Sequence, residues 1–447
     1  MTDGIGPETV HWTDGRVHHD TSAFPIERAE RDGYGVYAYE DAPESIDALL
    51  REAVSSAPDR EAFVFPDADR RDTYREFDER IDRLATGLAG EGVERGDVVG
   101  ILLSNRPEFL EAYFACARLG AVSAPINTRL SSREFGYVLG DAEPTCLLTE
   151  AAFGELLSET DHDLGSDSVF AVNADFGRLY QTLLGDGTPP SPSIATEETA
   201  SILYTSGTTG LPKGAAISNR AFIARGMARN VMGLHTKDQP DNIAWLPMFH
   251  MASADFVATV ALQGGTYYPI DGFKPGVVLD TLERSETRLL LIVPATVQEL
   301  LDYVHEEDID IPASDIDLGY IGSQPDLVAP NKITELSETF DAKFLNSFGA
   351  TETGFAPATG NHFAPGEKLD PEMWKEESPV CEARLVDESW ETVPQGEVGE
   401  MAMRGPTLFS GYIGNQQANE EDFEEAMEPR HVAISLDGEP TLYPHLP

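Results

Sequence analysis

The sequence predicts an α/β fold in which parallel β-sheets are flanked by helices. Short apolar runs, typical of buried strands, alternate with longer segments whose apolar residues recur every three or four positions, as in amphipathic helices. Turns rich in glycine and proline separate these segments. The chain has 447 residues, 41% of them hydrophobic, which is enough for two or three domains with large cores.

The clearest alternation lies near the amino terminus. A helical pattern starts at Ser45, and a second amphipathic helix is expected over residues 77–88, where Gly90 stops it. A short buried strand is expected at 98–103, followed by a helix over 108–119. Strands that alternate with helices indicate parallel pairing.

A stretch at residues 161–192 is rich in Gly, Asp, Ser and Pro and predicts a junction. Beyond it we expect strands at 200–203, 242–246 and 289–293 and a helix at 219–232. From about residue 375 onward, strands and turns dominate. The expected organisation is an extension over 1–40, a first α/β subdomain over 41–190, a second over 191–374, a small β subdomain over 375–423 and an atypical tail over 424–447.

The charge balance is extreme, because 31 basic residues face 78 acidic residues, giving a net charge of −47. Such a chain would repel nucleic acid, so a nucleic-acid partner is not expected. An acidic surface also repels itself at low salt, whereas about 1 M salt shortens the Debye length to about 3 Å. The composition resembles that of proteins from salt-accumulating archaea, and we expect the protein to need molar salt to stay folded.

Cysteine usage and hydropathy indicate an ordinary intracellular protein. The three cysteines, Cys116, Cys146 and Cys381, lack metal-ligand spacing, and the first two lie in apolar surroundings typical of small core residues. The amino terminus lacks the pattern of a signal peptide, and no apolar run approaches 18 residues. We therefore expect a cytoplasmic protein without a membrane span.

Residues 204–214, with the sequence YTSGTTGLPKG, carry the strongest functional signal. Glycines let successive N–H groups converge on one anion, hydroxyls add donors, and Lys213 adds a charge suited to phosphate. Lys213 follows Leu211 and Pro212, so the spacing is not that of a Walker A loop. A flexible linker is the alternative, but a linker needs neither the apolar strand before this segment nor the Pro-Lys-Gly after it. The expected phosphate ligands are Thr205, Ser206, Gly207, Thr208, Thr209, Gly210 and Lys213.

This loop resembles the signature loop of the AMP-forming acyl-CoA synthetases, within the adenylate-forming superfamily. Residues 73–121 are similar to the family's amino-terminal segment, which residues 125–129 continue. Residues 346–354 (NSFGATETG) are similar to its adenine and metal motif, and residues 396–412 (GEVGEMAMRGPTLFSGY) to its last large-domain motif. The similarity covers roughly residues 41–423. It implies the large domain of such an enzyme, with two α/β subdomains whose sheets are flanked by helices and a small β-barrel-like subdomain.

The resemblance also implies the reaction. A carboxylate, fatty or aryl, attacks the α-phosphate of ATP to give an acyl-adenylate and pyrophosphate, and catalysis of this kind depends on positioning and charge neutralisation. The loop with Lys213 would hold the β- and γ-phosphates. Glu352 would be the Mg²⁺ ligand, and Thr351 would add a hydrogen bond to phosphate.

Two further segments would surround the nucleotide. One is the motif of Asn346, Ser347, Phe348, Gly349, Ala350 and Thr351; the other is a turn of Gly322, Ser323, Gln324 and Pro325. Phe348 stands where the family more often has tyrosine, so its ring can stack on adenine without a hydroxyl contact. Ser323 and Gln324 are larger and more polar than the usual residues of that turn, which bears on nucleotide fit and pocket depth.

His250 matches a position that lines the acyl site in many relatives; the alternative is a core histidine with satisfied hydrogen bonds. Apolar walls are expected from Phe249, Met251, Val293, Pro294 and Ala295. An apolar lining favours an acyl or aryl carboxylate over a polar amino acid. Asp255 is not at the position of an α-amine anchor.

The family pattern breaks after residue 415. The Thr-Gly-Asp segment and the carboxy-terminal domain, which supplies a lysine for adenylation and builds the CoA channel, are expected to be absent; Asp437 is only a weak substitute for the ribose ligand. CoA would then be used only if such a domain is supplied, and the expected protein partner is a second copy in a homodimer or a separate chain that carries this domain. Two interpretations stay open: an adenylating domain that is incomplete alone, or a catalytically degenerate ATP- and acyl-binding paralogue or truncated gene product.

Overall fold

A computed structural model describes the chain in stretches separated by gaps. The described residues are 26–31, 34–39, 42–205, 211–311, 316–323, 328–355, 359, 361–369, 381–387, 389, 391–394, 397–424 and 431–434. Several expectations fall outside these residues: those for Ser206, Gly207, Thr208, Thr209, Gly210, Gln324, Pro325 and Asp437, for most of the extension and for most of the tail.

A seven-stranded sheet forms the largest layer, with the strand order β11-β10-β6-β5-β7-β8-β9. Its strands are β5 (Val98–Leu102), β6 (Val122–Pro125), β7 (Cys146–Glu150), β8 (Val169–Val172), β9 (Arg178–Leu179), β10 (Thr199–Thr205) and β11 (Lys213–Ser218). Every pair is parallel except β10 with β11. The predicted parallel α/β architecture is therefore confirmed. Helices α3 (Pro107–Leu119), α4 (Ser132–Ala142) and α5 (Gly154–Glu159) connect successive strands from β5 to β8, and α2 (Tyr74–Gly90) precedes β5.

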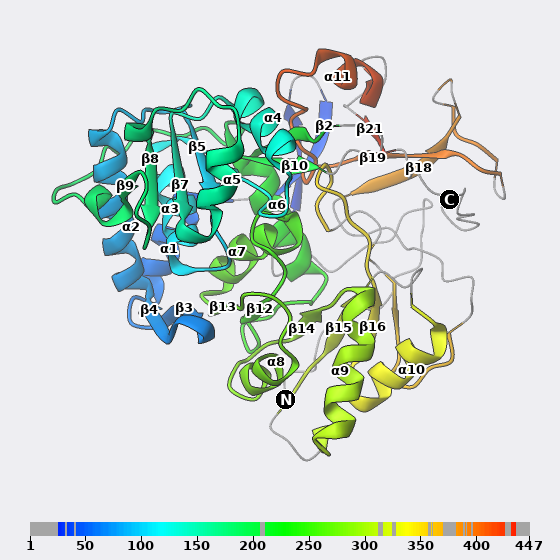
Figure 1. The fold of residues 1–447 in the computed structure, drawn as a ribbon. Helices are drawn as coiled ribbons and strands as arrows, with labels where there is room; N and C mark the ends of the chain where they lie inside the picture. The colour runs from blue at the N-terminus through cyan, green and yellow to red at the C-terminus, as the bar shows by residue number, and fades with distance from the viewer. Residues whose placement is uncertain are drawn as a thin grey trace.

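Two four-stranded sheets follow. One has the order β12-β13-β3-β4, from β3 (Glu61–Phe65), β4 (Arg70–Thr73), β12 (Asn242–Ala244) and β13 (Tyr267–Pro269). The other has the order β14-β15-β16-β17, from β14 (Leu289–Leu291), β15 (Tyr320–Ser323), β16 (Lys343–Asn346) and β17 (His362–Phe363), with α8 (Pro275–Leu282), α9 (Pro294–Glu306) and α10 (Pro330–Thr339). Figure 1 shows this last group apart from the seven-stranded sheet, with α7 (Met251–Gln263) between the two.

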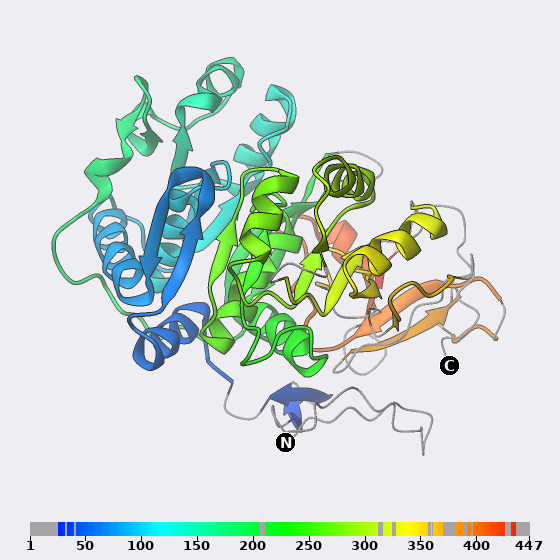
Figure 2. The same ribbon diagram turned by 90° about the horizontal axis from the view of Figure 1, so that it is seen from below.

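A fourth sheet confirms the β character expected after residue 375. It has the order β18-β19-β21-β20, from β18 (Glu382–Val386), β19 (Glu400–Arg404), β20 (Phe423–Glu424) and β21 (His431–Ile434). Helix α11 (Gln416–Asp422), which was not expected, precedes β20. Near the amino terminus, β1 (Ile26–Arg31) and β2 (Tyr34–Tyr39) form a hairpin at the periphery (Figure 2), followed by α1 (Ile46–Ser56).

The sheets do not follow the order of the chain. Strands β10 and β11, beyond residue 190, join the seven-stranded sheet, where Ser201 of β10 pairs with Ser123 of β6. Conversely, β3 joins the later strand β13 through Phe63 and Tyr267. The expected boundary between residues 190 and 191 therefore does not coincide with a boundary between sheets.

Capping fixes where the helices begin. Thr73 and Glu76 form a capping box at the start of α2, which therefore begins three residues before the predicted position. Apolar residues of α2 and α3 pack into the main core, where the rings of Phe77 and Phe114 meet edge to face with centroids 5.6 Å apart. Cys116 and Cys146 are buried, as predicted, and so is Cys381. Among the helices that the structure describes, none combines the length and apolar character that a membrane crossing requires.

Candidate active site

A cavity of about 1100 Å³ opens where the parallel strands end. The carboxyl ends of β5, β6, β12, β14 and β16 are all followed by residues that line it, and the last residues of β10 line it as well. In parallel sheets, ligands bind outside the carboxyl ends of the strands, so this edge is the expected place for a site. The lining comes from residues 103–105, 127–129, 203–205, 213, 245–247, 249–252, 271–273, 291–294, 296, 347–352, 355 and 412.

Both ends of the predicted phosphate loop reach this cavity. Thr205 ends β10 and Lys213 begins β11, and the two residues are partners in the antiparallel hairpin. The Lys213 ammonium lies 4.7 Å from the ring centroid of Tyr412. The loop between them, residues 206–210, is outside the described residues, so its contact with phosphate stays a prediction.

Glu352 lies on a turn beyond β16 and lines the same cavity. The hydroxyl of Tyr412 donates a hydrogen bond of 2.8 Å to its Oε1, and the backbone N–H of Phe409 donates one of 2.8 Å to its carbonyl. Within the part of the chain that the structure describes, no basic side chain forms an ion pair with this carboxylate. Its negative charge is therefore available to a cation in the cavity.

The rest of the predicted nucleotide motif divides into two groups. Ser347, Phe348, Gly349, Ala350 and Thr351 line the cavity. Asn346, Gly322 and Ser323 instead lie buried in the neighbouring strands β16 and β15, behind the cavity wall. The hydroxyl of Thr359 accepts the N–H of Phe348 and also lies 2.9 Å from its carbonyl, which fixes the backbone at the aromatic position.

His250 lies on the cavity wall rather than in the core. It caps the amino terminus of α7, where its Nδ1 accepts the backbone N–H of Ala252 at 3.1 Å. In the neutral ring the hydrogen is therefore on Nε2. The side chain is open to the cavity but surrounded by protein, and this poorly solvated setting lowers the pKa of His250, although Asp255 partly opposes the effect.

The predicted apolar walls are largely present. Phe249, Met251, Val293 and Pro294 line the cavity, whereas Ala295 does not. Two aromatic residues that were not predicted, Trp245 and Phe273, extend this wall. The indole N–H of Trp245 donates to the carbonyl of Leu291 at 2.8 Å, and its ring meets that of Phe273 with centroids 4.7 Å apart.

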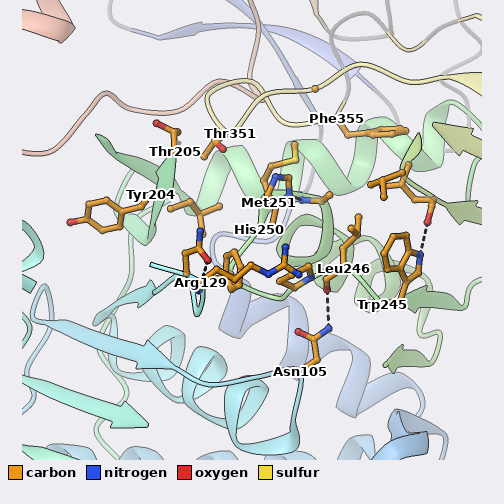
Figure 3. A pocket seen from close by; sticks show the side chains of 18 of the residues that line it. Asn105, Arg129, Tyr204, Thr205, Trp245, Leu246, His250, Met251, Thr351 and Phe355 are labelled. Atoms are coloured by element: carbon orange, nitrogen blue, oxygen red, sulfur yellow. Dashed lines mark hydrogen bonds between the residues drawn. The ribbon is translucent and has the colours of Figure 1, made fainter. Parts of the chain in front are cut away.

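Asn105 is a positioning residue that the sequence analysis missed. Its side-chain amide donates to the carbonyls of Leu246 (2.8 Å) and Ile270 (2.9 Å) and accepts the N–H of Met248 at 2.8 Å. It therefore holds the loop before His250 in place, as Figure 3 shows for the contact with Leu246. The available signal was a polar residue shortly after the buried strand β5.

Arg129 and Tyr412 were quoted in motifs but given no role. Figure 3 shows the side chain of Arg129 extending into the cavity toward Leu246 and His250. Among the described residues, no carboxylate forms an ion pair with it. Tyr412 reaches the cavity because residues 410–413 lie along the edge strand β11: Ala216 donates to the carbonyl of Gly411 and accepts from Ser410, and Ala215 pairs with Tyr412.

Sequence comparisons find CoA ligases among the proteins that are similar to this chain. The chain is 29% identical to an indoleacetate–CoA ligase of Aromatoleum aromaticum over 369 residues, which is 81% of this chain and 70% of that ligase. It is 28% identical to a long-chain-fatty-acid–CoA ligase of Thermus thermophilus over 368 residues, 78% of this chain and 66% of that ligase.

The fold is similar to a solved structure of o-succinylbenzoate coenzyme A synthetase from Bacillus subtilis in complex with ATP and a magnesium ion. The TM-score is 0.71 at 23% identity, covering 86% of this chain and 75% of the other. The sequence profile of the AMP-binding enzymes matches residues 50–413. This chain therefore belongs to the AMP-binding enzyme family.

Proposed function

We propose that this chain activates a fatty or aryl carboxylic acid with ATP, forming an acyl-adenylate as part of an AMP-forming CoA ligase activity. The observation that carries the proposal is the composition of the single cavity described above. Lys213, Thr351 and Glu352 lie at one part of its lining, and an aromatic and aliphatic wall with His250 forms another. A polyanion and an apolar acid can therefore meet in one space.

The nucleotide would be held by charge complementarity. Lys213 would neutralise the β- and γ-phosphates, together with the residues of the loop that precedes it. Phe348 would supply a face for the adenine. As the acid's carboxylate oxygen attacks the α-phosphorus, the bond from that phosphorus to the bridging oxygen breaks, and pyrophosphate leaves with the electron pair.

The residues present fit a magnesium ion that is shared with the substrate. Within the described residues, no group of three or more His, Cys, Asp or Glu side chains could hold a metal by itself. Mg²⁺ usually binds through one or two carboxylates, with water and substrate phosphates completing its octahedron. Glu352 would be the protein ligand, and the bound ion would neutralise charge on the phosphates.

The acid would be oriented by the wall that carries His250. A neutral imidazole that donates from Nε2 can align a carboxylate without holding it as tightly as a cation would. The aromatic pair of Trp245 and Phe273 would cover an aryl ring or an alkyl chain. Arg129, which extends into the same cavity, would attract the anionic reactants.

The thioester step is proposed only for the complete ligase. In the family, a carboxy-terminal domain supplies a lysine and builds the CoA channel, and the match to the Aromatoleum ligase covers 70% of its length. We propose that CoA is used when such a domain is present, on the same polypeptide or on a partner, and that the chain assembles with such a partner or as a homodimer. We also propose a cytoplasmic location and a requirement for molar salt.

A second candidate is a catalytically degenerate protein that binds ATP and an acyl group. It is favoured by the departures from the family pattern at Phe348 and at the turn that begins with Gly322 and Ser323, where the Ser323 hydroxyl is buried without a hydrogen-bond partner among the described residues.

Carboxylate-dependent ATP–pyrophosphate exchange in high salt separates the two candidates. Short, medium, long and aromatic acids are compared, with ATP binding measured in parallel by calorimetry. We expect exchange with one class of apolar acid, because adenylation is reversible. ATP binding without exchange for any acid would contradict adenylation and support the second candidate.

A further inference from the structure

Two arginines of helix α6 (Asn219–Val231) are fully buried against one carboxylate. Arg225 donates from Nη1 to Oδ1 of Asp255 at 3.1 Å, and Nη2 of Arg229 lies 3.5 Å from Oδ2. All three side chains have a relative exposure of 0%. A buried guanidinium must satisfy its remaining N–H groups inside the protein. The remaining N–H groups of Arg225 must therefore find acceptors elsewhere in the fold.

Those acceptors are backbone carbonyls in two segments far apart in the sequence. Arg225 donates from Nη2 to the carbonyl of Thr351 at 2.9 Å and from Nε to the carbonyl of Thr407 at 2.8 Å. Thr351 directly precedes Glu352. Thr407 belongs to the segment whose Phe409 and Tyr412 both donate to Glu352. The two segments that meet at Glu352 are thus both attached to one guanidinium.

The turn after Glu352 leaves room for this side chain. Gly354 has φ +72°, and a Cβ at this position would lie 2.5 Å from Nε of Arg225. Any other residue would strain the backbone and push the guanidinium away. The N–H of Gly354 also closes the turn by donating to the carbonyl of Ala350 at 2.8 Å. The absence of a side chain at this turn is what allows Arg225 to reach Thr351 and Thr407.

We propose that Arg225 is a positioning residue that orients the carboxylate of Glu352 toward the cavity before the nucleotide and its metal bind. This inference rests on the proposed function, in which Glu352 is the metal ligand. A guanidinium is suited to the role because its planar fork presents donors in several fixed directions, whereas an ammonium is a single point charge. Groups that orient a metal ligand usually affect metal affinity when they are changed.

Arg225→Lys and Arg229→Lys form a matched pair of variants. Both residues lie on α6, are fully buried and share Asp255, and both changes keep the charge. Among the described contacts, Arg229 touches neither Thr351 nor Thr407; it stacks on the rings of Phe256 and Phe355, at 4.2 and 4.9 Å from their centroids. A purely structural role would therefore affect both variants in the same way.

Mn²⁺ binding in the presence of a non-hydrolysable ATP analogue, followed by electron paramagnetic resonance, tests the inference without turnover. We expect Arg225→Lys to weaken Mn²⁺ binding by about 10–100-fold and Arg229→Lys to leave it nearly unchanged, even if both lower the melting temperature. Equal weakening in both variants, or none in either, would overturn the inference.

Gly354→Ala gives a second variant if Arg225→Lys does not fold. It displaces the guanidinium but retains it, and we expect the same loss of Mn²⁺ affinity; unchanged affinity would overturn the inference. Wild-type protein that binds no Mn²⁺ with the analogue would instead refute the proposed function, and this inference with it. A failure in the variants alone refutes only the role of Arg225.

Discussion

At the scale of single residues, the carboxylate of Glu352 is held by a contact that also reaches the expected phosphate ligand. One oxygen accepts the hydroxyl of Tyr412, whose ring lies beneath the ammonium of Lys213. The tyrosine therefore contacts both the expected metal ligand and the expected phosphate ligand. These three side chains come from three segments, so the phosphate end of the cavity depends on the tertiary fold.

Glu352→Gln should reduce pyrophosphate exchange by about 10²–10³, the usual effect of removing one preorganised polar group from such a site. The amide has nearly the same shape and can still accept from Tyr412, but it lacks the charge that Mg²⁺ requires. Exchange rates at increasing Mg²⁺ measure the effect. Glu299→Gln, on an exposed part of α9, is the control and should not change the rate. An active Glu352→Gln protein would show that another group holds the metal.

At the scale of elements, the connection between α6 and β12 contains His235, a buried histidine that stays neutral in the folded protein. Burial, together with the guanidiniums of Arg229 and Arg288, lowers the pKa of His235 to about 3. The ring packs against Phe256 of α7 with centroids 5.6 Å apart. In the unfolded chain the imidazole has a pKa near 6.5, so only the unfolded state takes up this proton between about pH 6.5 and pH 3.

Folding stability should therefore fall as the pH is lowered through this window, by about 1.4 kcal/mol per pH unit from His235 alone. Many carboxylates titrate in the same range, so the useful quantity is the difference between the wild type and His235→Gln. We expect the wild type's advantage in free energy of unfolding to shrink by about 2 kcal/mol between pH 7 and pH 5. Urea denaturation in high salt measures it, and a difference independent of pH would refute a buried neutral histidine.

The elements also show what a single sequence can reveal. Periodicity was sufficient to predict strands β5, β10, β12 and β14 and helices α1, α2, α3 and α6, because burial of one face leaves a local pattern. It could not reveal that Phe63 pairs with Tyr267, or that β10 joins the strands before it, because register between distant strands leaves no local trace. This explains why the expected boundary at residue 190 does not separate the sheets.

In the candidate site, residues that belong to recognisable motifs could be predicted from the sequence, whereas residues that hold distant segments in place could not. Lys213, Thr351, Glu352 and His250 were identified by resemblance to family motifs, and the structure brings all four to one cavity. Asn105 and Arg225 were not predicted, because their roles lie in hydrogen bonds to carbonyl groups far away in the sequence. Any residue can supply a carbonyl, so no residue type marks these contacts in a sequence.

At the scale of the whole molecule, the net charge of −47 dominates the response to salt. The Debye length is about 10 Å at 0.1 M salt and about 3 Å at 1 M, so only high salt screens repulsion between neighbouring surface carboxylates. We expect the melting temperature to rise steadily between 0.1 and 2 M KCl. Circular dichroism measures it, with sucrose as an uncharged control. A melting temperature independent of KCl would show that repulsion between surface carboxylates does not limit the stability of the fold.

The segment at residues 410–413, which lies along strand β11, has a consequence for folding during synthesis. These residues cover β11, the outermost strand of the seven-stranded sheet, whose hydrogen-bonding groups would otherwise face solvent. Uncovered strand edges recruit other chains. On the ribosome, β11 emerges well before residues 410–413 do, so this edge of the nascent sheet stays open to pairing with other chains until the later segment covers it.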